Sequence, residues 1–212
     1  MKSLFRELNG LINHFPIKNK EATSLLIQLP PENSLEAQLI LIKNLTGRGF
    51  KFVILSGGRP CHDLINTFKY KNINLENIYI IDMICRSHNL DVKNQKMVTH
   101  LEGMQELTKI SIIIGNMVIP KKTILFIDSI TSMLLYNNEA IFTKFINDIL
   151  KKMRIRGVHL ILLITKGKNY DNLRDELTSS PTLKGGDSLH VGQYLWRDES
   201  RDSLHTLLLF LE

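Results

Sequence analysis

Asp128 and Ser129 are the residues whose type and place in the sequence best suit chemistry. They follow a mostly apolar run at 122–127, in the stretch ILFIDSITSM, which predicts a buried strand ending in an acidic residue. A carboxylate at the end of a buried parallel strand can hold a magnesium ion, often through water, beside the phosphates of a nucleotide. Asp is also a common turn and helix-cap residue, so a purely structural role fits the same position.

Two pairs of potential zinc ligands follow other predicted strands. Cys61 and His62 come after the second strand, and Cys85 and His88 come after the third. Because ligands of parallel sheets bind beyond the carboxyl ends of the strands, these four side chains could converge on zinc. The ligand pairs and spacings typical of structural zinc sites are absent, and a buried cysteine usually acts as a small hydrophobe. No metal is therefore assigned from the sequence, and the four residues stay as candidates.

The elements that must position these residues alternate between strand and helix. Apolar runs without a polar face predict buried strands, and apolar residues at helical spacing predict the helices between them. This pattern is typical of an α/β fold in which a mostly parallel sheet has helices on both faces. Strands are predicted at 22–29, 51–55, 78–84, 122–127 and 158–164, and helices at 3–15, 33–47, 62–70, 101–117 and 138–157.

Helix caps and polar stretches refine this outline. Asn33 with Glu36 resembles a capping box, and Asn138 is the predicted N-cap of the best helix in the chain. Residues 86–99 are poor in apolar side chains and predict an exposed excursion. A C-terminal β-hairpin is expected from 193–196 and 206–211.

Length and composition favour one domain that functions in the cytoplasm. The 212 residues are enough for a core, and we expect an N-terminal helix at 1–18, a core at 20–165 and a C-terminal loop and hairpin at 166–212. We expect no membrane segment, since no apolar run reaches the roughly 20 residues needed to cross a bilayer. Two cysteines make no disulfide framework. The net charge of +6 mildly favours anionic partners such as nucleic acid, although many lysine-rich proteins share it.

The order of these features resembles the RecA superfamily, especially the archaeal KaiC-like and RadA-like ATPase domains. The resemblance covers roughly 20–165 and rests on SGGRPCHDLINTF, NIYIIDM, LTKISIIIGN, FIDSITSML and RGVHLILLI, taken in order. It implies a fold of the P-loop NTPase type and a magnesium site at Asp128 and Ser129. Thr165, after the last predicted strand, is a further position that matches the family pattern. The resemblance also implies assembly through subunit surfaces around the nucleotide site.

Two catalytic parts of that family are missing from this chain. The segment matching the glycine-rich phosphate loop is 30–37, PPENSLEA, which has no glycine. Leu35 stands where the resemblance implies the phosphate-binding lysine, and Glu36 stands where it implies the magnesium-binding hydroxyl. Gly57 and Gly58 stand where the KaiC-like relatives carry paired glutamates, one of which activates the attacking water.

These losses have a large cost in the binding free energy of Mg-ATP. A lost charge-assisted hydrogen bond costs about 1.5–3 kcal/mol, and a carboxylate about 4 Å from a phosphate charge adds roughly 4 kcal/mol of repulsion. Together they weaken binding by about four powers of ten or more. Ordinary Mg-ATP binding is therefore not expected. Asp128 and Ser129 then indicate the ancestry of the fold and are poor evidence for catalysis.

We therefore expect a RecA-like chain that has lost ATP binding and hydrolysis and has no catalytic residues and no cofactor. Its expected role is regulation or scaffolding, through a protein partner or a homo-oligomer. One alternative is an unconventional ATP-binding protein or ATPase in which Mg-ATP is held by lysines from elsewhere. Another is a nucleic-acid-binding module like the recombinase paralogues.

Overall fold

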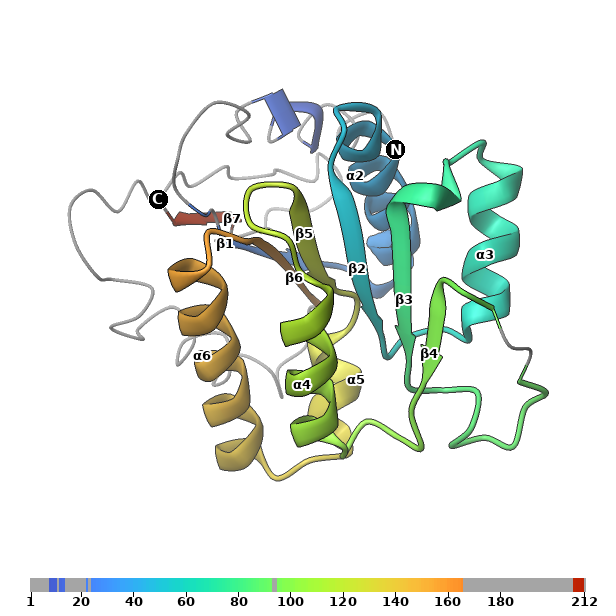
Figure 1. Cartoon of the computed structure of the whole chain (residues 1–212), viewed down its shortest axis with the longest axis vertical. Coiled ribbons are helices and arrows are strands. Elements are labelled where there is room, and N and C mark those ends of the chain that lie inside the picture. The colour runs from blue at the N-terminus through green and yellow to red at the C-terminus, as the bar shows by residue number, and fades with distance from the viewer. Residues whose placement is uncertain are drawn as a thin grey trace, which may run out of the picture.

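A sheet of seven strands forms the centre of the protein in the computed structural model, which describes residues 8–10, 12–13, 22, 24–92, 95–165 and 208–211 (Figure 1). The strands are β1 (Ser24–Leu29), β2 (Lys51–Ser56), β3 (Ile78–Asp82), β4 (Val98–His100), β5 (Thr123–Ile127), β6 (His159–Thr165) and β7 (Leu208–Leu211). Their order across the sheet is β4-β3-β2-β5-β6-β1-β7.

Six of these strands are parallel to one another. Only the edge strand β7 runs antiparallel, and it pairs with β1. The predicted α/β class with a mostly parallel sheet is therefore confirmed. The strand expected at 206–211 is present as β7, while the other half of the predicted hairpin, 193–196, lies outside the described residues.

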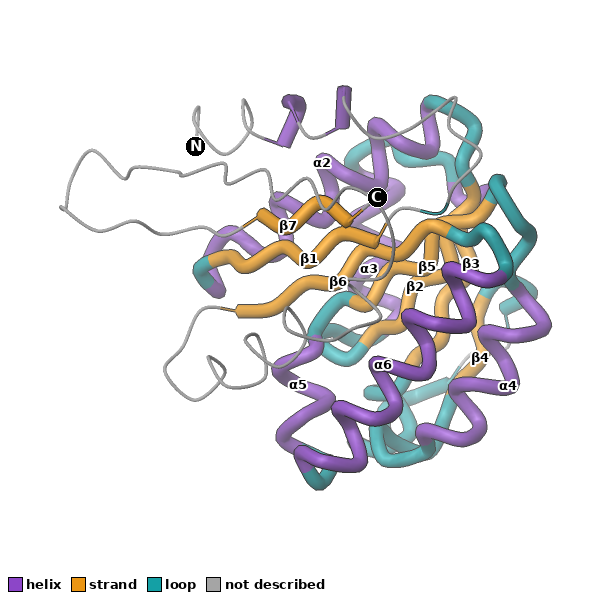
Figure 2. Tube along the Cα trace, turned by 90° about the vertical axis from the view of Figure 1, so that its left-hand side faces the viewer, coloured by secondary structure: helices purple, strands orange, loops and turns teal. Residues whose placement is uncertain are grey.

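Helices cover both faces of the sheet, as Figures 1 and 2 show. One face packs against α4 (Leu107–Met117), α5 (Ile130–Leu135) and α6 (Glu139–Ile155), and the other against α2 (Ser34–Gly47) and α3 (Cys61–Tyr70). Successive residues of β5 alternate between these two cores, with Leu125 and Ile127 in the first and Ile124 and Phe126 in the second. This alternation is the period-2 geometry of a strand buried on both sides.

The cap predicted for α6 is present. Asn138 Oδ1 accepts hydrogen bonds from the backbone N–H groups of Ala140 (3.1 Å) and Ile141 (3.3 Å). The capping box predicted at Asn33 is wrong, because Asn33 has right-handed helical dihedrals and its side chain makes no cap hydrogen bond. A short 3₁₀ turn, η1 (Pro31–Asn33), leads into α2 instead.

Two further predictions need correction around the polar stretch at 86–99. Residues 86–91 are exposed as predicted, but the stretch also contains the start of β4, whose three residues are too few to show strand periodicity in the sequence. The helix predicted from residue 101 begins only at Leu107, because Leu101 and Met104 are buried in turns that carry the chain from β4 to α4. A second 3₁₀ turn, η2 (Leu75–Asn77), and the short helix α5 were also not predicted.

The first predicted helix is described only in part. Residues 8–10, 12 and 13 are helical, and Leu8 and Ile12 are buried against the face that α2 and α3 cover. The remainder of 1–18 and the segment 166–207 lie outside the described residues. Among the helices that are described, none is both long and apolar enough to cross a membrane.

Candidate functional site

The turn between β1 and α2 occupies the place of the expected phosphate loop. Pro30 and Pro31 have no backbone N–H to offer an anion. The N–H of Asn33 donates to Pro30 O at 3.0 Å, and the N–H of Ser34 donates to Pro31 O. Four of the five positions from 30 to 34 therefore have no free backbone donor, whereas a phosphate loop binds phosphates through such donors.

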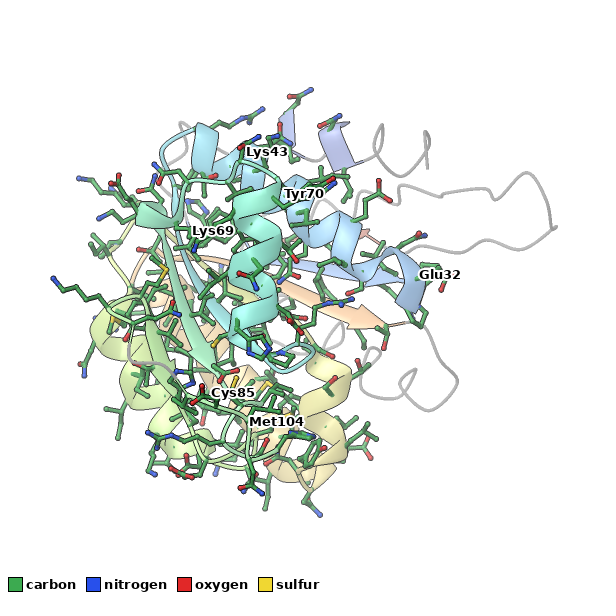
Figure 3. The ribbon with its side chains drawn as sticks, turned by 90° about the vertical axis from the view of Figure 1, so that its right-hand side faces the viewer. Glu32, Lys43, Lys69, Tyr70, Cys85 and Met104 are labelled. Atoms are coloured by element: carbon green, nitrogen blue, oxygen red, sulfur yellow. The ribbon has the colours of Figure 1, made fainter. Side chains whose placement is uncertain are left out.

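The first turn of α2 has the wrong charge for a phosphate. Leu35 and Glu36 are half-buried there, and Glu36 is the acidic residue of that turn. A carboxylate at a helix N-terminus is stabilised by the helix dipole. The same position would repel a bound phosphate. Figure 3 shows Glu32 at the outer tip of the η1 turn, where it adds an exposed carboxylate to this end of the sheet.

Asp128 lies directly after β5 and is only 5% exposed. Its Oδ2 is 3.4 Å from Ser56 Oγ, which makes its shorter hydrogen bond, 2.7 Å, to Arg59 O. Burial raises the pKa of Asp128 to about 6, while the positive charge of Arg59 and the nearby Gln38 and Ser56 oppose that rise. Burial therefore disfavours the charged form of this carboxyl group, which is nevertheless mostly ionised at neutral pH.

Gln38 offsets the poor solvation of this carboxylate only in part. Its side chain is buried, and its Nε2 makes no hydrogen bond of ordinary geometry within the described part of the chain. The amide attracts the charge of Asp128, but this attraction is smaller than the effect of burial. The carboxylate is thus held in a site that does not favour its charged form.

The hydroxyl groups near Asp128 serve the fold. Ser129 is the N-cap of α5, where its Oγ accepts the backbone N–H of Ser132 at 3.1 Å. Thr165 Oγ1 donates to Thr131 Oγ1 at 2.8 Å, which ties the end of β6 to α5. These contacts give Ser129 and Thr165 structural roles.

Gly58 lies against the carboxylate of Asp128. A Cβ atom at residue 58 would stand 2.9 Å from Asp128 Oδ1, which is closer than real Cβ contacts. A Cβ at Gly57 would meet Met83 Cε at 3.2 Å, a tight contact with a flexible side chain. A glutamate at 58 therefore requires the buried carboxylate to move.

A second group of polar side chains gathers at the same edge of the sheet. Cys61, at the start of α3, places its Sγ 3.9 Å from the Sγ of Cys85, which follows β3. Asp82, the last residue of β3, and His100, the last residue of β4, complete the group, and the four potential ligand atoms lie within 4.8 Å of one another. Figure 3 shows Cys85 just beyond the N-terminal end of α3.

The zinc candidates from the sequence are only partly brought together. Cys61 and Cys85 meet, and His62 Nδ1 lies 3.9 Å from Cys85 Sγ, although half of the His62 side chain is exposed. His88 is exposed, and its Nδ1 contacts Ile84 O and Ser87 Oγ instead. His88 is thus not among the clustered ligand atoms.

Asp82 is the centre of this group. Its Oδ2 lies 2.7 Å from His100 Nδ1 and accepts the backbone N–H of Cys85 at 3.2 Å. Burial, followed by the hydrogen bond to Asp82, raises the pKa of Cys85 to about 12, and burial with the Asp82 charge also raises the pKa of Cys61. Both thiols are therefore protonated at neutral pH when no metal is present.

Sequence reasoning missed Asp82 and His100. Asp82 ends an apolar strand in NIYIIDM as Asp128 does in ILFIDS, so the same signal was available for both. His100 could not be paired with it, because β4 was not predicted and the register Asp82↔His100 exists only once β4 is placed beside β3.

Comparison with known proteins gives a likeness at the level of the fold. No protein-family model and no curated protein matches the sequence. Among solved structures, this chain is similar to an uncharacterised protein of Pyrococcus horikoshii solved in complex with an unknown peptide. That likeness has a TM-score of 0.54 and 12% identity, over 81% of this chain and 79% of the other. The fold class of this protein is thus an α/β domain with a mostly parallel sheet.

A KaiC-like protein of the hyperthermophilic archaeon Pyrococcus horikoshii OT3 is also structurally similar. The TM-score is 0.45 and the identity 16%, over 69% of this chain. This chain spans 62% of the length of that protein.

Proposed function

We propose that this chain is a RecA-like domain that no longer binds or hydrolyses ATP and acts as a regulatory or scaffolding interaction protein. The observation that carries the proposal is the turn from Pro30 to Ser34, where two prolines and two internal hydrogen bonds leave four positions without a free N–H. A phosphate loop depends on such donors.

The energies are large enough to matter. Each charge-assisted hydrogen bond to a phosphate contributes about 1.5–3 kcal/mol. Losing two of them weakens binding by about two to four powers of ten. Glu36 acts in the same direction, because its carboxylate in the first turn of α2 repels phosphate.

An interaction role is supported by apolar side chains at the α5–α6 corner. Leu135, Tyr136 and Ile141 are 73%, 54% and 61% exposed, and they lie within seven consecutive residues. Single exposed apolar residues are ordinary, but a group of them is typical of a contact surface. The similar protein from Pyrococcus horikoshii was solved with a peptide, which is a precedent for such binding on this fold.

The proposed partner is a protein, either another copy of this chain or a different one. Sedimentation velocity over a range of concentrations separates these cases, because only self-association makes the sedimentation coefficient rise with concentration. If neither self-association nor a co-purifying protein is found, the interaction role is contradicted. The nucleic-acid alternative rests on the net charge of +6 and gains no support from the basic end of α6, where Arg156 Nη1 donates to Gly115 O at 2.7 Å.

An ATP turnover assay on the purified chain tests the loss of catalysis. We expect phosphate release no faster than in the buffer, with or without magnesium. The Asp128→Ala variant should behave identically, because Asp128 has no nucleotide to act on. Steady turnover by the natural chain that is lost in Asp128→Ala would overturn the proposal.

A further inference from the structure

We propose that Cys61, Asp82, Cys85 and His100 form a zinc site that joins β3, β4 and α3. The four side chains are largely removed from solvent: Asp82 and Cys85 are fully buried, Cys61 is 5% exposed, and the His100 side chain is 6% exposed. They come from three separate segments of the chain, and their ligand atoms lie within 4.8 Å of one another. Such convergence of soft and nitrogen donors in a buried place is unusual without a bound ion.

The spacing of the two sulfurs matches a tetrahedral zinc ion. Zinc–sulfur bonds of about 2.3 Å at a tetrahedral angle place two sulfurs about 3.8 Å apart. The Sγ atoms of Cys61 and Cys85 are 3.9 Å apart. An ion can therefore bind both thiolates with little movement of the backbone.

The backbone fixes the other two groups beside the sulfurs. Asp82 and His100 are paired in the register of β3 and β4, so their side chains lie on the same side of the sheet edge. Cys85 is held in the following turn by the hydrogen bond from its N–H to Asp82 Oδ2. The contact of 2.7 Å between Asp82 and His100 is the kind by which a carboxylate orients a ligating histidine.

An unpaired atom gives an independent indication of a ligand. His100 Nε2 is buried and has no hydrogen-bond partner among the residues that the structure describes. A buried nitrogen without a partner is destabilising, and native structures seldom leave one. A metal ion bound to the imidazole ring would remove this cost.

The donor set selects the class of metal. Two sulfurs with an imidazole and a carboxylate suit zinc, whereas magnesium and calcium prefer oxygen ligands alone. Because Asp82 Oδ2 already contacts His100 Nδ1, the direct ligands are the two sulfurs and His100 Nε2, and Asp82 orients the imidazole ring. A pocket of about 440 Å³ lined in part by Cys61, His62 and Asp91 gives the ion a path from solvent.

Zinc titration of the full chain tests this proposal. The chain is reduced and stripped of metal, and Zn²⁺ is added in competition with a chromophoric chelator. We expect one ion per chain, and a loss of affinity of about a hundredfold or more in Cys85→Ser and in His100→Ala. Zinc in thousandfold excess over Kd should also raise Tm by roughly 10 °C.

His88→Ala is the matched control, since His88 lies three residues beyond Cys85 but is not among the clustered ligands. It should bind zinc as the natural chain does. If the cysteine and histidine variants fail to fold, Co²⁺ added to the natural chain gives a second measurement, because thiolate ligation produces a charge-transfer band. Absence of that band, zinc binding unchanged in Cys85→Ser, or a Cys61–Cys85 disulfide in the purified protein would overturn the site.

Discussion

The Asp128→Asn variant is expected to be more stable than the natural protein at pH 8, by about 2–3 kcal/mol. Burial raises the pKa of Asp128 in the folded state from 3.8 to about 6. The folded state therefore holds this proton more tightly than the unfolded state does. The stability that the group contributes is complete below pH 3.8 and is lost as the pH rises through 6. Asparagine has no charge to bury, so the variant does not lose this stability as the pH rises.

Urea unfolding at several pH values between 5 and 8 measures this effect. The two proteins should differ least at pH 5, and the gap should widen by about 1 kcal/mol up to pH 7 and then stay constant to pH 8. Asp148→Asn is a suitable control, because Asp148 is exposed on α6 and its replacement should not change the pH dependence. A gap that stays constant across this range would show that folding does not raise the pKa of Asp128, and a gap that favours the natural protein at pH 8 would show that the charged form is stabilised.

Replacing Gly58 is expected to destabilise the protein through the same carboxylate. The Cβ of Gly58→Ala would stand 2.9 Å from Asp128 Oδ1, and such overpacking costs about 1–3 kcal/mol. Gly58→Glu should cost more, because it adds a second negative charge beside a carboxylate that is already poorly solvated. The glutamate that the KaiC-like resemblance implies at this position therefore conflicts with Asp128 as it is now placed.

Unfolding of single and double variants at pH 8 separates the two causes. If charge matters, Gly58→Glu should lower the free energy of unfolding less in the Asp128→Asn background than in the natural chain. The loss caused by Gly58→Ala should differ much less between these two backgrounds. Gly57→Ala is the matched control and should have a smaller effect than Gly58→Ala, since its new Cβ meets only the flexible end of Met83. Equal stability of Gly58→Glu and the natural chain would contradict the packing that we describe.

The sheet could be predicted from the sequence because its strands are apolar on both faces. Periodicity placed β5 within one residue of its observed bounds, and the amphipathic pattern with Asn138 located α6. The elements that the sequence did not predict are short. β4 has three residues and α5 has six, which is too little for a periodic pattern.

The sequence predicted only those candidate site residues that strand order alone can place. Residues that follow a strand, such as Asp128, Cys61 and Cys85, can be placed at one sheet edge from strand order alone. His100 could not be placed, because its partner Asp82 is identified only by the register of β3 with β4. The lack of glycine in PPENSLEA is visible in the sequence, whereas the internal hydrogen bonds of the turn from β1 to α2 require coordinates.

Calorimetric titration of the purified chain with Mg-ATP tests the central claim most directly. With prolines or internally bonded N–H groups at residues 30, 31, 33 and 34, we expect no saturable heat up to millimolar nucleotide. Saturable, magnesium-dependent binding with Kd well below 1 mM (about −4 kcal/mol), weakened in Asp128→Ala, would contradict the account.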